Sequence, residues 1–120
     1  MLVDHRESKS IIPTLLRLAG LELEETQLLV GDYIIAEQVI VERKTASDFV
    51  ASIKDRRLFE QAERLSEAYR RPILLLEGKP RGLPRKSILG ALASVAARGL
   101  AIVEVDDDEE AAQFLLSLAR

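Results

Sequence analysis

The stretch GDYIIAEQVIVERKTASDF, residues 31–49, is the most informative part of this chain for predicting its fold and a functional site. Two β-branched runs, 32–36 and 39–44, flank Glu37 and Gln38, which predicts a β-hairpin. Glu42 and Lys44 stand two residues apart on the second predicted strand, so their side chains share one face of the sheet. Charged groups in apolar segments are costly unless they are paired or used, so this face is the first candidate for a functional site.

The hairpin loop decides whether Asp32 joins that face. A two-residue turn would set Asp32 opposite Arg43, on the wrong face of the sheet. A three-residue loop or a β-bulge would set it opposite Glu42 and bring Asp32, Glu42 and Lys44 together. A shared site therefore requires that the hairpin not be of the tightest type.

Two carboxylates and a lysine on one surface suit metal-dependent hydrolysis of a phosphodiester. Mg²⁺ prefers oxygen ligands and needs only one or two carboxylates beside waters and a substrate phosphate. An ammonium group nearby can orient the attacking water or stabilise the transition state. The alternative is that Lys44 only neutralises Glu42 in an ordinary ion pair, the commoner meaning of an isolated E-x-K.

The rest of the chain alternates strands with helices over 120 residues, which predicts one α/β layer domain. The absence of cysteine excludes disulfides and zinc–thiolate sites, and no apolar run approaches the roughly 18 residues of a membrane span. We expect a cytoplasmic protein, close to the nucleoid in a prokaryote, or a nuclear one in a eukaryote. Further strands are predicted at 1–3, 73–78 and 100–105, and helices at 11–20, 47–53, 58–69, 87–99 and 108–120.

Charge is unevenly placed, although the net charge of −3 does not by itself indicate binding to nucleic acid. Basic residues gather in 54–71 and 79–86, and acidic residues in 22–25 and 106–110. The basic loop offers candidate phosphate contacts, which a solvated loop explains almost as well: Lys79, Arg81, Arg85 and Lys86.

Five motifs occur in a fixed order along the chain: VDHRE (3–7), GDY (31–33), VERKTASD (41–48), SIKDRRLFEQ (52–61) and LLLEG (74–78). Together they resemble the nuclease domain of the XPF/Mus/Hef family of structure-specific DNA endonucleases, most closely its archaeal members, whose signature is GD followed by ERKxxxD. The resemblance implies a restriction-endonuclease-like α/β fold, with a central mixed β-sheet flanked by α-helices. It also implies cleavage of branched DNA (3′-flap or fork) near the junction of duplex and single strand, with Mg²⁺ or Mn²⁺.

The resemblance assigns roles to the matching positions. Asp32, Glu42 and Asp4 would form the metal site, to which the carbonyl of Arg43 would add an oxygen. Lys44 would be the catalytic lysine. Asp48 would support the site, although by itself it reads as a first-turn helix acid. DNA contacts would come from Arg6, Glu7, Arg57 and Gln61.

One position departs from the family pattern. Arg56 stands where the family often has glycine before the arginine that matches Arg57. The departure puts the local backbone conformation in question and leaves Arg57 in place.

The family also implies partners. Its members act as dimers, and the helices Ser87–Arg98 and Glu110–Ala119 are candidates for the contact surface, with packing onto the sheet as the equal alternative. A heterodimer with a related subunit is the other form. Residues 1–120 are expected to be a single nuclease domain without the helix–hairpin–helix and helicase regions of larger members. The alternative functions are a non-catalytic DNA-binding or scaffold subunit, and a junction resolvase of the same fold.

Overall fold

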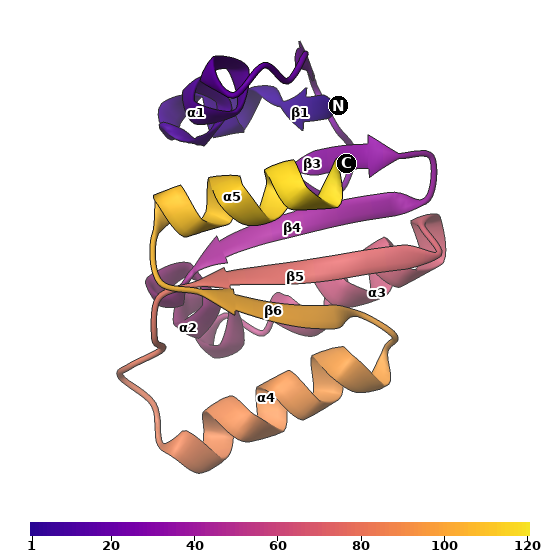
Figure 1. The fold of residues 1–120 in the computed structure, drawn as a ribbon. Coiled ribbons are helices and arrows are strands. Elements are labelled where there is room, and N and C mark those ends of the chain that lie inside the picture. Colours follow the sequence, from indigo (N-terminus) through magenta and orange to yellow (C-terminus); the bar gives the residue numbers. More distant parts are fainter.

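A mixed six-stranded sheet with helices on both faces forms the centre of the computed structural model, which describes all of residues 1–120 (Figure 1). The strand order is β2-β1-β3-β4-β5-β6. The strands are β1 (Leu2–Asp4), β2 (Glu24–Thr26), β3 (Tyr33–Ala36), β4 (Val39–Thr45), β5 (Arg71–Glu77) and β6 (Ala101–Val105). The helices are the 3₁₀ helix η1 (His5–Lys9) and α1 (Ile12–Leu18), α2 (Ala46–Lys54), α3 (Leu58–Ala68), α4 (Arg85–Ala97) and α5 (Asp108–Leu118).

Strand β4 joins two differently built parts of the sheet. It is antiparallel to β3 on one side and parallel to β5 on the other, and β5 is parallel to β6. Residues 72–76 of β5 are all buried, as expected for an apolar strand covered on both faces. The mixed sheet flanked by helices confirms the predicted fold class.

Two hydrophobic cores lie on opposite faces of the sheet. The larger contains Ile40 and Leu74, covered by α2, α3 and α4. The second contains Tyr33 and Val41, covered by α1 and α5. Since Ile40 belongs to the first core, alternation along β4 directs Glu42 and Lys44 to the face that α2, α3 and α4 cover.

Two α-helices begin at residues whose side chains cap them. Thr45 caps α2 by accepting a hydrogen bond from the Asp48 N–H, and Asp107 caps α5 in the same way. Strand β2 and the helix η1 were not predicted, because each is too short for a periodic pattern. Strand β5 begins at Arg71 and includes Pro72, which we had placed before the strand. None of the helices is long and apolar enough to cross a membrane.

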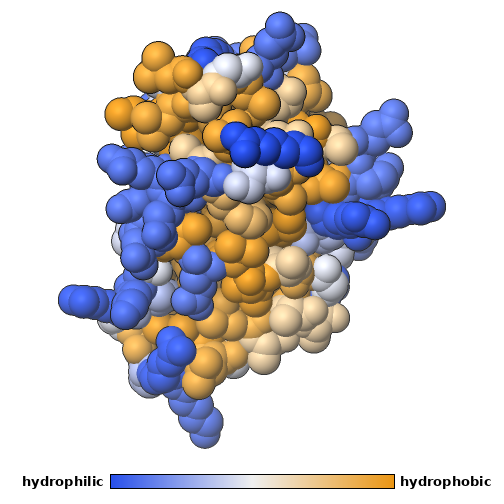
Figure 2. Space-filling model, viewed as in Figure 1, coloured by the Kyte–Doolittle hydropathy of each residue, from blue (hydrophilic) through white to orange (hydrophobic).

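Helices α4 and α5 both pack onto the sheet, one on each side of the edge strand β6. Packing within the chain does not cover them fully: Leu89 on α4 is 49% exposed, and Phe114 on α5 is partly exposed. Figure 2 shows apolar residues running down the face that carries α5, β6 and α4, between charged margins.

Arg56 occupies a backbone conformation that favours glycine. Its φ of 60° lies in the left-handed region, directly after α2. The Arg56 N–H donates to the Ile53 carbonyl (3.1 Å) and the Arg57 N–H to the Ser52 carbonyl (2.9 Å), the paired bonds of a Schellman helix end. The glycine that the family often has here therefore relieves strain in a turn that this chain forms with arginine.

We expect Arg56→Gly to raise the free energy of unfolding by about 1 kcal/mol, because glycine adopts positive φ without the steric cost that other residues incur. Thermal or urea unfolding measures the change. Lys54→Gly is the matched control; two residues earlier, inside α2, it should lower stability by about 1 kcal/mol. Equal losses in both variants would show that the turn does not strain Arg56.

Candidate active site

The hairpin register brings Asp32 to the face of the sheet that carries Glu42 and Lys44. Tyr33 pairs with Val41 and Ile34 with Ile40, and a bulge then shifts the pairing so that Ala36 faces Val39. The same register places Asp32 opposite Glu42, and the Asp32 N–H donates to the Val41 carbonyl (2.9 Å). The bulged form of the hairpin is the one that the sequence required for a shared site.

Asp32 and Lys44 are both buried, each with 8% of its surface exposed, and Glu42 is half-buried. Oδ2 of Asp32 accepts a hydrogen bond from the Arg43 N–H (2.7 Å), while no protein group donates to Oδ1. None of the ion pairs in the structure joins Lys44 to Glu42. The simple surface ion pair that we weighed as the alternative is therefore absent.

The two carboxylates lie in an environment that disfavours their charge. Burial, with the charges of Glu42 and Glu7, raises the pKa of Asp32 to about 8. Burial also raises the pKa of Glu42, although Lys44 and Arg6 act in the opposite direction. A divalent cation between Asp32 and Glu42 would offset this repulsion, and no larger group of acidic or histidine side chains forms a metal site. The donor set thus fits a Mg²⁺ or Mn²⁺ ion held by two carboxylates.

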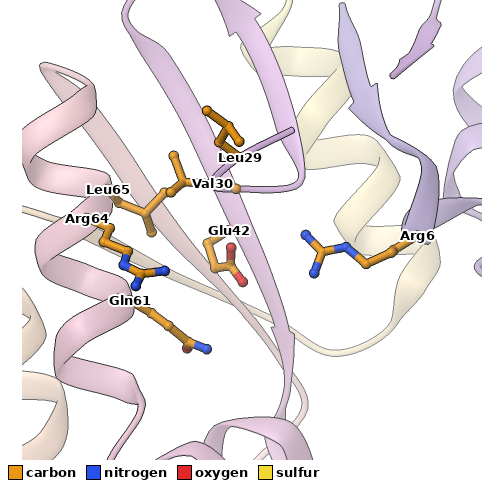
Figure 3. Close-up of a pocket in the computed structure, with 8 residues that line it drawn as sticks. Arg6, Leu29, Val30, Glu42, Gln61, Arg64 and Leu65 are labelled. Carbon is orange, nitrogen blue, oxygen red and sulfur yellow. The ribbon is translucent and has the colours of Figure 1, made fainter. Parts of the chain in front are cut away.

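A cavity of 160 Å³ opens beside Glu42 (Figure 3). Arg6 and Arg64 extend toward Glu42 from opposite sides, Arg6 from η1 and Arg64 from α3. Sequence reasoning had found Arg6 but not Arg64, although the spacing of Gln61 and Arg64 places both on one face of a helix. The remaining lining residues are Leu29, Val30, Gly31 and Leu65.

Gln61 has a free acceptor next to the catalytic pair. Its Oε1 atom is buried and has no hydrogen-bond partner. Gln61 also lines a second small hollow together with Glu42 and Lys44. A buried acceptor without a partner is costly, so this atom is suited to bind a water or substrate group in the site.

Asp4 is buried and fully engaged within the protein. Its Oδ1 accepts from the Leu28 N–H (2.9 Å), and its Oδ2 accepts from the backbone and side chain of Arg6. Burial opposes its charge, but these hydrogen bonds outweigh it and lower the pKa of Asp4. The prediction that Asp4 ligates the metal is therefore not supported; it anchors Arg6 and the loop before Asp32.

Arg43 joins a buried ionic network behind the site, on the α1 and α5 side of the sheet. Its guanidinium donates to Glu77 (Nε to Oε1, 3.0 Å) and to Glu7 (Nη1 to Oε1, 3.5 Å). The Tyr33 hydroxyl donates to Glu7 (2.7 Å). Burial disfavours the charged form of Arg43, but the bonds to Glu77 and Glu7 outweigh it and raise the pKa of Arg43.

Two expectations change because of this network. Glu7 is buried and paired, so the prediction that it contacts DNA is wrong. The side chain of Arg43 faces away from Glu42, so only its backbone reaches the catalytic face. The N–H and C=O of a strand residue point to the same side, so the Arg43 carbonyl also faces Asp32.

The other predicted residues are exposed and have only local partners or none. Asp48 is exposed in the first turn of α2 and makes no ion pair, and its N–H bonds to Thr45. Arg57 is exposed at the start of α3 and pairs with Asp55 (3.3 Å). Of the four predicted basic residues, Lys79 and Arg81 lie in the loop after β5, whereas Arg85 and Lys86 lie in the first turn of α4. All four are exposed and have no ion-pair partner.

Comparison with known proteins places this site in a family. The family model of the ERCC4 domain matches residues 3–118. The 3′-flap repair endonuclease Xpf of Saccharolobus solfataricus is 52% identical over 75 residues, which are 62% of this chain and 32% of that protein. The DNA repair endonuclease XPF of Cricetulus griseus is 42% identical over 98 residues, 78% of this chain and 11% of that protein.

A solved structure agrees with the fold. XPF from Aeropyrum pernix in complex with DNA superposes with a TM-score of 0.92 at 39% identity, covering 99% of this chain and 62% of that one. The chain spans a third or less of the length of these two sequence relatives. The match over nearly all of the chain confirms the resemblance that the ERKxxxD motif indicated. The chain belongs to the ERCC4 domain family.

Proposed function

We propose that this domain is the Mg²⁺- or Mn²⁺-dependent catalytic part of a structure-specific DNA endonuclease, cutting flap or forked DNA near the junction of duplex and single strand. The observation that carries the proposal is the pairing of buried Asp32 with half-buried Glu42 across the hairpin, with buried Lys44 on the same face and an arginine on each side of Glu42. The relatives named as 3′-flap and DNA repair endonucleases support it. Such a domain would act wherever the cell keeps its DNA, in the cytoplasm or the nucleus.

Each residue of the site would have a separate role in the proposed cleavage reaction. Asp32, through its free Oδ1, and Glu42 would hold the cation. When bound, the cation would supply Lewis acidity and offset negative charge on the phosphate. Lys44 would donate to the scissile phosphate or the attacking water, and Oε1 of Gln61 would accept a hydrogen bond from that water. Arg6 and Arg64 would hold phosphates on either side.

The proposal is tested with labelled duplex, 3′-flap, fork and four-way-junction DNA incubated with Mg²⁺, Mn²⁺ or EDTA. Metal-dependent incision next to a branch point supports it, and loss of incision in Asp32→Asn excludes a contaminating nuclease. Binding of branched DNA without any incision would favour the scaffold alternative. Incision confined to four-way junctions would favour the resolvase alternative.

We also propose that the domain forms a dimer through α4, α5 and the open edge of β6. An edge strand presents unpaired backbone groups, which proteins usually cover. Here that edge lies in the apolar face of Figure 2, where Leu89 and Phe114 keep exposed area. A second copy or a related subunit would bury this face.

Leu89→Arg should weaken the dimer at least about tenfold, because it puts an unpaired charge into the buried centre of the interface. Analytical ultracentrifugation over a range of protein concentrations measures the dissociation constant. Leu18→Arg is the control, since Leu18 is an exposed leucine on α1, outside this face. An unchanged dissociation constant in Leu89→Arg would place the contact elsewhere.

A further inference from the structure

We propose that the loop before Asp32 and the outer face of α3 form a groove that binds an unpaired base of the substrate strand, next to the scissile phosphate. The key residue is Leu29, whose surface is 98% exposed. This inference rests on the proposed nuclease function and adds to it the path of the single strand away from the site.

The exposure of Leu29 is imposed by the loop on both sides of it. On one side the Leu28 N–H is held by buried Asp4 (2.9 Å). On the other, Gly31 has a φ of 78° and lies so close to Ile40 that a Cβ would stand 2.3 Å from its side chain. Since the backbone is held in place at Leu28 and at Gly31, the side chain of Leu29 projects from the surface at a fixed position.

Leu29 stands where two hollows meet. One is the 160 Å³ cavity that contains Glu42 and Arg6. The other, of 560 Å³, runs along α3 to Tyr69. The two share Leu29, Val30 and Arg64, so they adjoin at these residues and together make a groove that leads from Glu42 to Tyr69.

The lining of the outer groove suits a nucleotide. Leu29, Val30 and Ala68 give an apolar wall, and Tyr69 adds an aromatic ring at the far end. Arg64 stands between this wall and the catalytic pair and contacts Glu60 in an exposed ion pair (2.8 Å), the kind that exchanges readily for a phosphate. Gln27, Leu28 and Glu67 complete the rim.

An unpaired base fits this groove better than a duplex does. In a duplex the apolar faces of the bases are stacked on one another, whereas a base in a single-stranded arm offers its face to an apolar wall. The groove begins beside Glu42, where the proposed function would put the scissile phosphate, so its occupant would be a nucleotide close to the cleaved bond.

The test couples a protein change to a DNA change. Single-turnover cleavage of a labelled fork is measured as a function of protein concentration, with an abasic site placed in turn at each nucleotide around the cleaved bond. We expect Leu29→Ala to raise the half-saturating concentration about tenfold on intact DNA. At one abasic position in the unpaired arm, the half-saturating concentration of wild type should also rise about tenfold. The same abasic site should not raise the half-saturating concentration of Leu29→Ala any further.

Leu18→Ala is the matched control, because Leu18 is also an exposed leucine but lies on α1, and it should behave as wild type at every position. The inference would be overturned if Leu29→Ala had no effect, or if its effect and that of the abasic site on the half-saturating concentration were additive at every position. If the two effects were non-additive only at paired nucleotides, the groove would bind duplex DNA instead. Fluorescence anisotropy of the same forks in EDTA gives a readout independent of cleavage. If wild type never cuts, the nuclease proposal fails, and the binding data still decide whether Leu29 contacts the base.

Discussion

Replacing Asp32 by asparagine is expected to abolish DNA cleavage and, at the same time, to stabilise the metal-free protein. Loss of one of two carboxylate ligands should lower the cleavage rate at least about 10³-fold, because metal ions supply several kcal/mol of transition-state stabilisation. The stabilisation follows from burial, because folding forces the Asp32 carboxyl to take up a proton at neutral pH, whereas asparagine keeps its shape and needs none.

The pKa of Asp32 predicts how the stabilisation by Asp32→Asn depends on pH. The pKa of Asp32 is about 8 in the folded protein and 3.8 when unperturbed, so folding takes up a proton between those values. The stability that comes from the protonated Asp32 carboxyl is fully present below pH 3.8. It is lost as pH rises toward 8, and the free energy of unfolding falls by about 1.4 kcal/mol per pH unit. At pH 7 the buried carboxyl therefore costs up to about 4 kcal/mol, which Asp32→Asn removes.

Thermal unfolding in EDTA across pH 4 to 8 measures this cost. Wild type should lose stability as pH rises, Asp32→Asn should show a flatter profile, and added Mg²⁺ should narrow the difference by stabilising only wild type. If Asp32→Asn were less stable than wild type at pH 7 in EDTA, the Asp32 carboxylate would be satisfied by the protein itself. A metal would then not be needed to offset its charge.

Replacing Arg43 by methionine is expected to lower the free energy of unfolding by about 3–5 kcal/mol, because it leaves two buried carboxylates without their partner. Glu77 and Glu7 both depend on this guanidinium, and the three side chains are largely buried. For a domain of this size such a loss is a large fraction of the total stability, which is typically about 5–15 kcal/mol.

Urea unfolding of Arg43→Met, compared with Arg64→Ala, measures the effect. Arg64 belongs to an exposed ion pair with Glu60, which contributes little, so its replacement should leave the midpoint almost unchanged. Combining Arg43→Met with Glu7→Gln and Glu77→Gln should restore part of the loss. Without such rescue, the loss would come from packing of the Arg43 side chain rather than from its charge.

That Asp32, Glu42 and Lys44 share one face of the sheet was predictable from the sequence, because the evidence for it is local. Strand alternation placed Glu42 and Lys44 together, and the hairpin left two registers for Asp32, of which a bulge selected the right one. The strand and helix alternation likewise predicted the layers of the fold. The elements β2 and η1 are too short to show a periodic pattern in the sequence. Their conformation depends on contacts with other parts of the chain: β2 pairs with β1, and Asp4 caps η1.

What the sequence did not predict depends on contacts between distant residues. Glu7 meets Tyr33 and Arg43 across 26 and 36 positions, so its burial is invisible in the motif VDHRE. The resemblance to the family implied that Asp4, in the VDHRE element, lies at the metal, whereas its hydrogen-bond partners in the structure are Arg6 and the Leu28 N–H. The exposure of Leu29 also needed the structure, since an apolar residue before a strand normally reads as core.

The bulge between Ile34 and Ala36 has an evolutionary consequence. It makes the site sensitive to the length of the hairpin as well as to the identity of its residues, because a register slip of one position exchanges the two faces of a strand. Losing a single codon there would move Asp32 to the other side of the sheet while every catalytic side chain remained in the gene. An ERCC4 domain with an intact ERKxxxD motif and a shortened hairpin is thus expected to be inactive, a form of gene decay that inspection of the motif alone would miss.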